Sequence, residues 1–206
     1  MQNFEKISEL VIVVDMINGF IKKGSMCDTS ICKIIPDMKR YLKNERDKGN
    51  TIIFIKEAHD IDCVEFKKFP MHCVKGTQEA QIIEELTPFV DKENVYEKNS
   101  TCAIFAKNFL KDLSKMNNLK KINICGCCTD ICVLNLTLPL VNYFDERNIK
   151  MEIIVNKNLV ATFNADYHNA KDYSEMAFKL MQLNGVAVVN TKIENNVVAS
   201  EMPKLF

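Results

Sequence analysis

Residues 121–144, KINICGCCTDICVLNLTLPLVNYF, form the stretch that decides the fold. The first five residues make a short apolar run with β-branched side chains, which predicts a buried strand over residues 121–125. Residues 130–144 carry apolar side chains at helical spacing, which predicts a helix soon after that strand. A strand followed by a helix is the repeating unit of an α/β protein.

Apolar runs and helical patterns alternate in the same way along the rest of the chain. The other predicted strands are residues 10–14, 51–55, 94–96, 151–155 and 185–189, and the other predicted helices are residues 34–48, 79–86, 101–116 and 172–183. This alternation implies right-handed crossovers and a mostly parallel, six-stranded sheet covered on both faces. We therefore expect a three-layer α/β/α fold of the Rossmann-like type, formed by residues 1–206 as a single domain.

The composition limits the partners and the compartment that we expect. Lysine plus arginine equals aspartate plus glutamate at 27 each, so net charge draws the chain to neither nucleic acid nor a membrane surface. No apolar run is long enough to span a bilayer. The first residues, MQNFEKISELVIVVDM, lack the cleavage site of a signal peptide. Nine cysteines, an odd number without a secretion signal, predict reduced thiols in the cytoplasm.

Chemically active residues follow four of the predicted strands. Asp15 follows the first strand, Glu57 and His59 the second, Lys98 the third, and the cysteine-rich residues 126–132 the fourth. In an open parallel sheet the carboxyl ends of the strands lie on one edge, where such sheets bind ligands. This convergence predicts a catalytic site. Two alternatives stay open, namely that Asp15 is a helix cap or loop anchor and that Lys98 is a solvated surface lysine.

The cysteine cluster allows three interpretations. Cys132 lies at a predicted helix start, where free N–H groups and the helix dipole favour a thiolate, and a nearby Lys98 would lower its pKa further. This pattern predicts a nucleophile. The second interpretation is a buried core thiol, and the third is a redox or zinc pair made of Cys125 and Cys128. A zinc ribbon needs a second C-x-x-C, which the chain lacks. The cysteines that we interpret as core residues are Cys27, Cys32, Cys63, Cys73, Cys102 and Cys125.

A second constellation lies in residues 56–77, KEAHDIDCVEFKKFPMHCVKGT. Glu57, His59, Glu65 and His72 supply two carboxylates and two imidazoles within sixteen residues. Such ligands suit zinc, manganese or iron and can leave positions open for a substrate. The alternative is a polar loop whose histidines form local caps or bridges. Cys73 is not expected to be a ligand, because on an extended backbone it points away from His72.

Together these segments resemble the isochorismatase-like cysteine hydrolases, and among them the nicotinamidase branch. The resemblance runs from about residue 10 to residue 185 and is carried by VVDMINGF, FPMHCVKGT, YEKNS and GCCTDICV. It implies an isochorismatase-like fold and a catalytic triad of Asp15, Lys98 and Cys132. It also implies a cis peptide between Cys127 and Cys128, with an oxyanion hole formed at Cys128 and Cys132. Substrate-binding aromatic rings are implied at Phe20, Phe69 and Phe105.

The function that the resemblance implies is hydrolysis of nicotinamide to nicotinic acid and ammonia through a cysteine thioester, in NAD salvage. The implied metal is zinc first, with manganese or iron as alternatives, and it sits at Glu57, His59, Glu65 and His72. The metal segment favours nicotinamide, because isochorismate hydrolases generally lack it. Glu57 departs from the usual aspartate by one methylene, which can alter metal binding. A homo-oligomer, dimer or tetramer, is expected by resemblance.

Two other functions stay open from the sequence. A related cysteine hydrolase acting on another small amide or on isochorismate would use the triad but leave the metal segment without a role. A non-catalytic binding protein would keep the fold and lose the reaction, although Asp15, Lys98 and Cys132 are all present. Failure to bind a divalent metal would favour the first of these, and an unreactive Cys132 thiol would favour the second.

Overall fold

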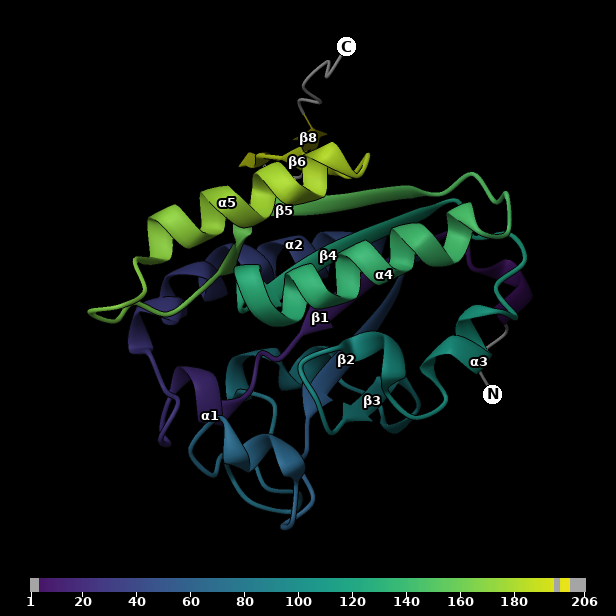
Figure 1. Ribbon diagram of the computed structural model, residues 1–206. Helices are drawn as coiled ribbons and strands as arrows, with labels where there is room; N and C mark the ends of the chain where they lie inside the picture. Colours follow the sequence, from purple (N-terminus) through teal and green to yellow (C-terminus); the bar gives the residue numbers. More distant parts are fainter. Residues whose placement is uncertain (1–3, 195–196, 201–206) are drawn as a thin grey trace.

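The centre of the computed structural model, which describes residues 4–194 and 197–200, is a parallel sheet of six strands (Figure 1). The strands are β1 (Glu9–Val14), β2 (Thr51–Glu57), β3 (Val95–Lys98), β4 (Lys121–Cys127), β5 (Glu152–Ala161) and β6 (Ala187–Val189). Their order is β3-β2-β1-β4-β5-β6. The chain adds β2 and β3 on one side of β1, and then adds β4, β5 and β6 on its other side. All six predicted strands are confirmed, and this change of side creates a switch point at the carboxyl ends of β1 and β4.

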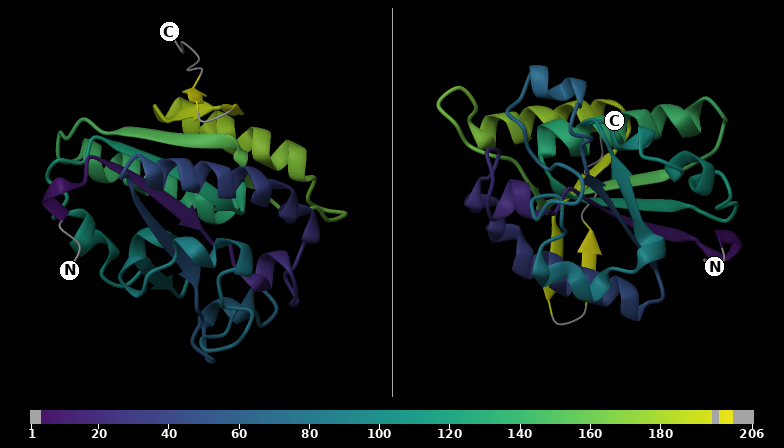
Figure 2. Two further views of the ribbon diagram at one scale, coloured as in Figure 1. Left: turned by 180° about the vertical axis from the view of Figure 1, so that it is seen from behind. Right: turned by 90° about the horizontal axis from the view of Figure 1, so that it is seen from below.

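The strands are apolar because both faces of the sheet are covered. One face carries α3 (Phe109–Leu113), α4 (Leu134–Asp145) and α5 (Ala170–Leu183), and the opposite face carries α2 (Ile35–Asp47) (Figures 1 and 2). Buried side chains of β1 alternate between the two cores, with Leu10, Ile12 and Val14 in one and Val11 and Val13 in the other. The three-layer architecture is therefore confirmed.

A close approach of two strands fixes the switch point. Gly126 in β4 pairs with Val14 in β1 and has a positive φ of 119°. A Cβ atom there would lie 2.0 Å from the carbonyl oxygen of Val14, so no larger residue fits without moving the backbone. This contact holds the turn after β4 directly beside the residue that follows β1, Asp15.

Two predicted helices are wrong. Residues 79–86 do not form an α-helix, and a 3₁₀ turn instead spans Glu84–Phe89 with Pro88 inside it. Residues 101–116 form a 3₁₀ turn at Ala103–Phe105 and then only the five-residue α3. Asn108 between them has a left-handed φ of 67°, which interrupts the helical hydrogen bonds. The apolar residues of these segments are spaced as in a helix, but they belong to turns and loops that pack against the core.

The remaining elements are short. They comprise α1 (Asn18–Ile21), 3₁₀ turns at Phe4–Lys6, Thr29–Ile34, Val64–Lys67 and Lys92–Asn94, a π turn at Thr129–Val133, and an antiparallel hairpin of β7 (Thr191–Glu194) and β8 (Val197–Ser200). The hairpin was not expected from the sequence, and the last residues, 201–206, lie outside the described residues. Among the described helices none has the length and apolarity needed to cross a membrane. The single domain over residues 1–206 stays a prediction.

Candidate active site

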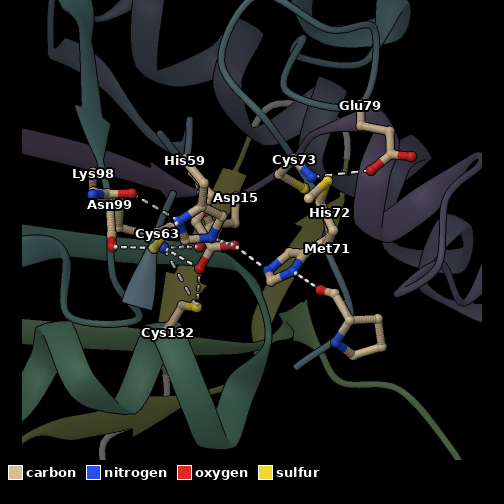
Figure 3. A network of polar contacts seen from close by, with 12 residues as sticks. Asp15, His59, Cys63, Met71, His72, Cys73, Glu79, Lys98, Asn99 and Cys132 are labelled. Atoms are coloured by element: carbon tan, nitrogen blue, oxygen red, sulfur yellow. Dashed lines mark hydrogen bonds and ion pairs between the residues drawn. The ribbon is translucent and has the colours of Figure 1, made fainter. Parts of the chain in front are cut away.

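Asp15, Lys98 and Cys132, from three separate segments, meet at the switch point (Figure 3), and Glu57 joins them from a fourth. Lys98 Nζ lies 2.8 Å from Asp15 Oδ2 and 2.7 Å from Glu57 Oε1. The sulfur of Cys132 lies 3.7 Å from Lys98 Nζ and 3.7 Å from Glu57 Oε1. All four residues are buried. We call Asp15, Glu57, Lys98 and Cys132 the charged centre, and the structure brings them together as the strand-end argument predicts.

Asp15 is held by the sheet itself. Its Oδ1 accepts a 2.7 Å hydrogen bond from the backbone N–H of Glu57, and its own N–H donates to Ile55 O at 2.9 Å. Its φ is 50°, a left-handed conformation that is uncommon for a residue other than glycine. The N-cap of α1 is Ile17, so the helix-cap alternative for Asp15 is excluded. Burial of Lys98 excludes the surface-lysine alternative in the same way.

The ionisable groups of the charged centre differ in how their pKa values are shifted. Burial raises the pKa of Asp15 to about 6, against the lowering effect of Lys98 and with help from Glu57. Burial also raises the pKa of Glu57, but Lys98 and the two neighbouring histidines outweigh it and hold that pKa well below its usual value. Burial disfavours the Lys98 ammonium, yet the charges around it raise its pKa well above the ordinary value. Asp15 is thus the carboxylate that can accept a proton near neutral pH.

The expected low pKa of Cys132 is wrong. Burial, together with the carboxylates of Asp15 and Glu57, raises the pKa of this thiol well above its usual value, and Lys98 opposes them only in part. The expectation weighed the helix start and one ammonium, but not the second carboxylate that the fold brings within 3.7 Å. The resting residue is a thiol, so its reactivity depends on a base rather than on a preformed thiolate.

The cysteines around the nucleophile have separate environments. The Cys127-Cys128 peptide is cis, in agreement with the resemblance. Cys127 donates its thiol to Asp15 O at 3.2 Å, and Cys125 donates to Ile12 O at 3.6 Å inside the core. All nine cysteines are free thiols. No candidate metal group among the described residues includes Cys125 or Cys128, so the structure gives no support to the redox or zinc interpretation of this pair.

The four predicted metal ligands also come together. One ligand atom each from Glu57, His59, Glu65 and His72 lies within 4.8 Å of the others. Both histidines present Nε2 to Glu57 Oε2, at 3.2 Å in each case. Burial lowers the pKa of each histidine, but hydrogen bonding to Glu57 outweighs it and raises the pKa. Glu57 therefore faces Lys98 with one oxygen and the imidazoles with the other.

The second ring nitrogens hold the histidines in orientation. His59 Nδ1 lies 3.1 Å from Asn99 Oδ1, and His72 Nδ1 lies 2.7 Å from Pro70 O. These oxygen acceptors favour the N–H on Nδ1, which leaves Nε2 available as a metal ligand. Two imidazole nitrogens and two carboxylate oxygens fit zinc, manganese or iron. The cluster therefore offers the donor set of a divalent metal site, and Cys73 is not part of it.

A cavity of about 160 Å³ opens beside both groups. Its lining includes Cys128, Cys132, Glu57, Glu65 and His72, together with the predicted rings of Phe20 and Phe69. Both rings lie near His72, with centroid distances of 5.8 Å and 6.4 Å.

The structure gives no support to the predicted role of Phe105 in substrate binding. Its side chain is 76% exposed, and it does not line the cavity. The short 3₁₀ turn that replaces the predicted helix over residues 101–116 ends at Phe105, and only Thr101 from this segment lines the cavity.

Sequence reasoning missed one wall of this cavity. Phe163, Asn164 and Tyr167 line it and belong to residues 162–169, which we call the β5–α5 loop. The strand-end rule would have found this loop, because it follows a strand of the same sheet. The predicted strand ended at residue 155, whereas β5 continues to Ala161, so the loop was not placed at the ligand-binding edge.

His168, which the sequence left without a role, ties this loop to the turn that carries the nucleophile. Its ring stacks between Phe163 and Tyr173, with centroid distances of 3.9 Å to each. His168 Nδ1 lies 2.9 Å from Phe163 O, and Nε2 lies 2.8 Å from Asp130 Oδ2. Asp130 stands two positions before Cys132, so one side chain links a cavity wall and the catalytic turn.

Comparison with known proteins gives a consistent result. A family model described as the isochorismatase domain matches residues 9–193. The chain is 24% identical over 178 residues to nicotinamidase 1 of Arabidopsis thaliana, which covers 79% of this chain and 72% of that protein. It is 26% identical over 179 residues to an uncharacterised isochorismatase family protein of Bacillus subtilis, covering 79% and 91%. The pyrazinamidase of Pyrococcus horikoshii in complex with zinc superposes with a TM-score of 0.72 at 23% identity, covering 89% and 99%.

Proposed function

The chain belongs to the isochorismatase family and is an amidohydrolase, and from this premise we propose that it is a nicotinamidase. The observation that carries the proposal is the position of Glu57, which pairs with Lys98 through one oxygen and with both histidines through the other. A nucleophile centre and a metal-type cluster thereby share one cavity of about 160 Å³. An aromatic amide whose ring carries a ligand atom suits such a cavity.

In the proposed reaction Asp15 accepts the proton of the Cys132 thiol, and the sulfur attacks the carboxamide carbon of nicotinamide. The proton that Asp15 holds then passes to the nitrogen as the carbon–nitrogen bond breaks, and ammonia leaves. Asp15 next takes a proton from water, whose oxygen attacks the thioester and releases nicotinic acid and the free thiol. Lys98 stays charged throughout and stabilises the negative charge that moves between Asp15 and Cys132.

The oxygen of the tetrahedral intermediate needs hydrogen-bond donors. We assign this role to the backbone N–H groups of Cys128 and Cys132, which the turn after β4 presents beside the sulfur. Cys128 and Cys132 both line the cavity. A donor of this kind contributes about 3 kcal/mol to the transition state in comparable enzymes.

Glu57, His59, Glu65 and His72 would hold the divalent metal, with zinc as the first candidate and manganese or iron as alternatives. The metal would supply a ligand position for the pyridine nitrogen and so orient the ring. Phe20 and Phe69 would pack against the ring from the cavity sides. This arrangement directs the carboxamide toward Cys132.

The experiment is ammonia release from nicotinamide by purified protein, before and after chelation and with zinc, manganese or iron restored. Benzamide, which lacks the ring nitrogen, is the matched control substrate, and isochorismate tests the alternative reaction. We expect metal-dependent release from nicotinamide with a KM well below that for benzamide. Equal KM values for the two amides would show that the metal does not take part in substrate binding. Hydrolysis of isochorismate but of neither amide would show that isochorismate, rather than nicotinamide, is the substrate.

The setting of this reaction follows the same proposal. Because nicotinic acid is a precursor for NAD, we propose that the enzyme acts in NAD salvage. The cytoplasm, expected from the odd number of cysteines without a secretion signal, is part of the same proposal. We also keep a homo-oligomer, dimer or tetramer, as part of the proposal, and sedimentation of the purified protein tests it.

A further inference from the structure

A second concave surface lies on the other side of the β5–α5 loop from the active site. This groove has a volume of about 640 Å³ and is formed by the 3₁₀ turn Thr29–Ile34, by β5 and by the start of α5. It is several times larger than the cavity beside the charged centre. Nothing in the proposed amide reaction uses it.

The groove is positively charged. Lys33, Lys157 and Lys171 line it, and no aspartate or glutamate does. The chain as a whole has equal numbers of basic and acidic residues, 27 of each, so a surface lined by three lysines without a carboxylate is a local excess of charge. Glu175 lies just outside, 4.0 Å from Lys157 Nζ. Its side chain is 52% exposed. A second carboxylate, Asp28, accepts hydrogen bonds from the backbone N–H groups of Ser30 and Asn164, which both line the groove, so the three lysines outnumber the two neighbouring carboxylates by one charge.

Two further features point to an anion. The hydroxyl of Thr162, which lines the groove and is 2% exposed, has no hydrogen-bond partner within the part of the chain that the structure describes. The N-terminus of α5, a helix of 14 residues, begins at the groove, so the positive end of the helix dipole adds to the lysine charge. Asn169 already accepts from the first helical N–H groups, which leaves lysines and hydroxyls as the ligand donors.

We propose that this groove binds a phosphate group carried by a small molecule, through Lys33, Lys157 and Lys171. Three ammonium groups match a dianion with several acceptor oxygens better than a single carboxylate. The volume leaves room beyond the phosphate for a sugar or a base. The site is thus a second ligand site, independent of the amide substrate.

The groove is placed to influence the active site. Asn164 lines both the groove and the catalytic cavity. Its backbone N–H donates to Asp28 Oδ2 at 2.8 Å, and its Oδ1 accepts from the N–H of Ala170 at 3.1 Å. A ligand that orders the β5–α5 loop from the groove side therefore alters the wall on the cavity side. We expect the KM for the amide to change when the groove is occupied, with little change in kcat.

The test is titration calorimetry of the full chain with AMP, inorganic phosphate and adenosine at two salt concentrations. AMP and phosphate should bind with affinities that fall as salt rises, and adenosine should not bind. AMP binding much tighter than phosphate would identify a nucleotide ligand, and similar affinities would identify the free anion. Absence of binding by both phosphate compounds, or equal binding of adenosine, overturns the proposal.

Matched variants locate the binding. The double variant Lys33→Gln/Lys171→Gln should weaken AMP binding by about tenfold or more. Lys179→Gln, an exposed lysine further along α5 that does not line the groove, should leave it unchanged. Equal losses in both variants, or no loss in the double variant with its thermal unfolding unaltered, contradict the assignment. Because calorimetry needs no turnover, this result is independent of whether nicotinamide is the amide substrate.

Discussion

The two sides of the catalytic cavity are built differently. On one side, the charged centre comes from the ends of β1, β2 and β3 and from the turn after β4, and all four side chains are buried. On the other side, the wall comes from the β5–α5 loop, where Asn164 and Tyr167 are exposed. Strand ends fix the reacting groups by the register of the sheet, whereas the loop is held by a few side-chain contacts. We infer that the first side determines the rate, and that the loop side contributes to substrate binding together with the proposed metal site.

The largest effect should follow from removing the nucleophile. Cys132→Ala should lower kcat for ammonia release by roughly a thousandfold or more, because it removes the thiol that lies 3.7 Å from Lys98 Nζ and from Glu57 Oε1. Cys32→Ala is the control, since that thiol lies outside the cavity and donates a hydrogen bond to Ile21 O. Comparable activity of Cys132→Ala and wild type would show that the charged centre does not supply the nucleophile.

Lys98→Met tests the charge balance of the same side. It leaves the carboxylates of Asp15 and Glu57 buried without their cation, so we expect loss of turnover and a free energy of unfolding lower by about 3–5 kcal/mol. The exposed pair between Lys75 and Glu97 is the control, and Lys75→Met should change stability far less, because water screens the charges of an exposed pair. Urea unfolding of both variants measures the difference, and equal losses would show that burial of the first pair has no special role.

His59→Ala tests the proposed metal site, which shares Glu57 with the charged centre. Loss of one imidazole from the proposed metal site should weaken zinc binding by roughly tenfold or more, since even partners of metal ligands have effects of this size. The KM for nicotinamide should rise more than kcat falls. Zinc affinity is measured by competition with a chelating dye. An unchanged zinc affinity would show that His59 is not a metal ligand and that it only hydrogen-bonds to Glu57.

His168→Gln should have a smaller effect on both constants. The substitution removes the ring that stacks between Phe163 and Tyr173 and disturbs the contact with Asp130. We expect a stability loss of about 1–3 kcal/mol and a higher KM, because the loop wall loses its link to the catalytic turn. Steady-state kinetics with thermal unfolding would separate the two effects. A fall in kcat at constant KM would place His168 with the reacting groups instead.

The smallest effect should come from the loop wall itself. Tyr167→Ala removes an exposed ring that lines the cavity, and we expect a rise in KM of roughly twofold to tenfold, the range of one aromatic contact. Phe105→Ala is the matched control, because Phe105 is similarly exposed but does not line the cavity. A KM effect for Phe105→Ala, with none for Tyr167→Ala, would reverse our correction of the cavity wall.

The same contrast explains what the sequence could predict. The six strands and the residues that follow them were found because a buried strand is a continuous apolar run, and its end marks the ligand-binding edge. The loop wall was missed because Asn156, Lys157 and Asn158 interrupt the apolar run of β5, so its end could not be located.

The pKa of Cys132 was predicted with the wrong sign for a related reason. The pKa depends on how deeply the thiol is buried and on the distance to Glu57, a residue 75 positions away in the chain. Neither quantity can be derived from local sequence.

The most direct test of the central claim is mass spectrometry of the protein quenched with acid during turnover of nicotinamide. The account predicts one nicotinoyl group attached to the peptide that contains Cys132, and no such adduct in Cys132→Ala. Ammonia release without an adduct at Cys132, or with the adduct on another cysteine, would contradict the assignment of the charged centre as the site of chemistry.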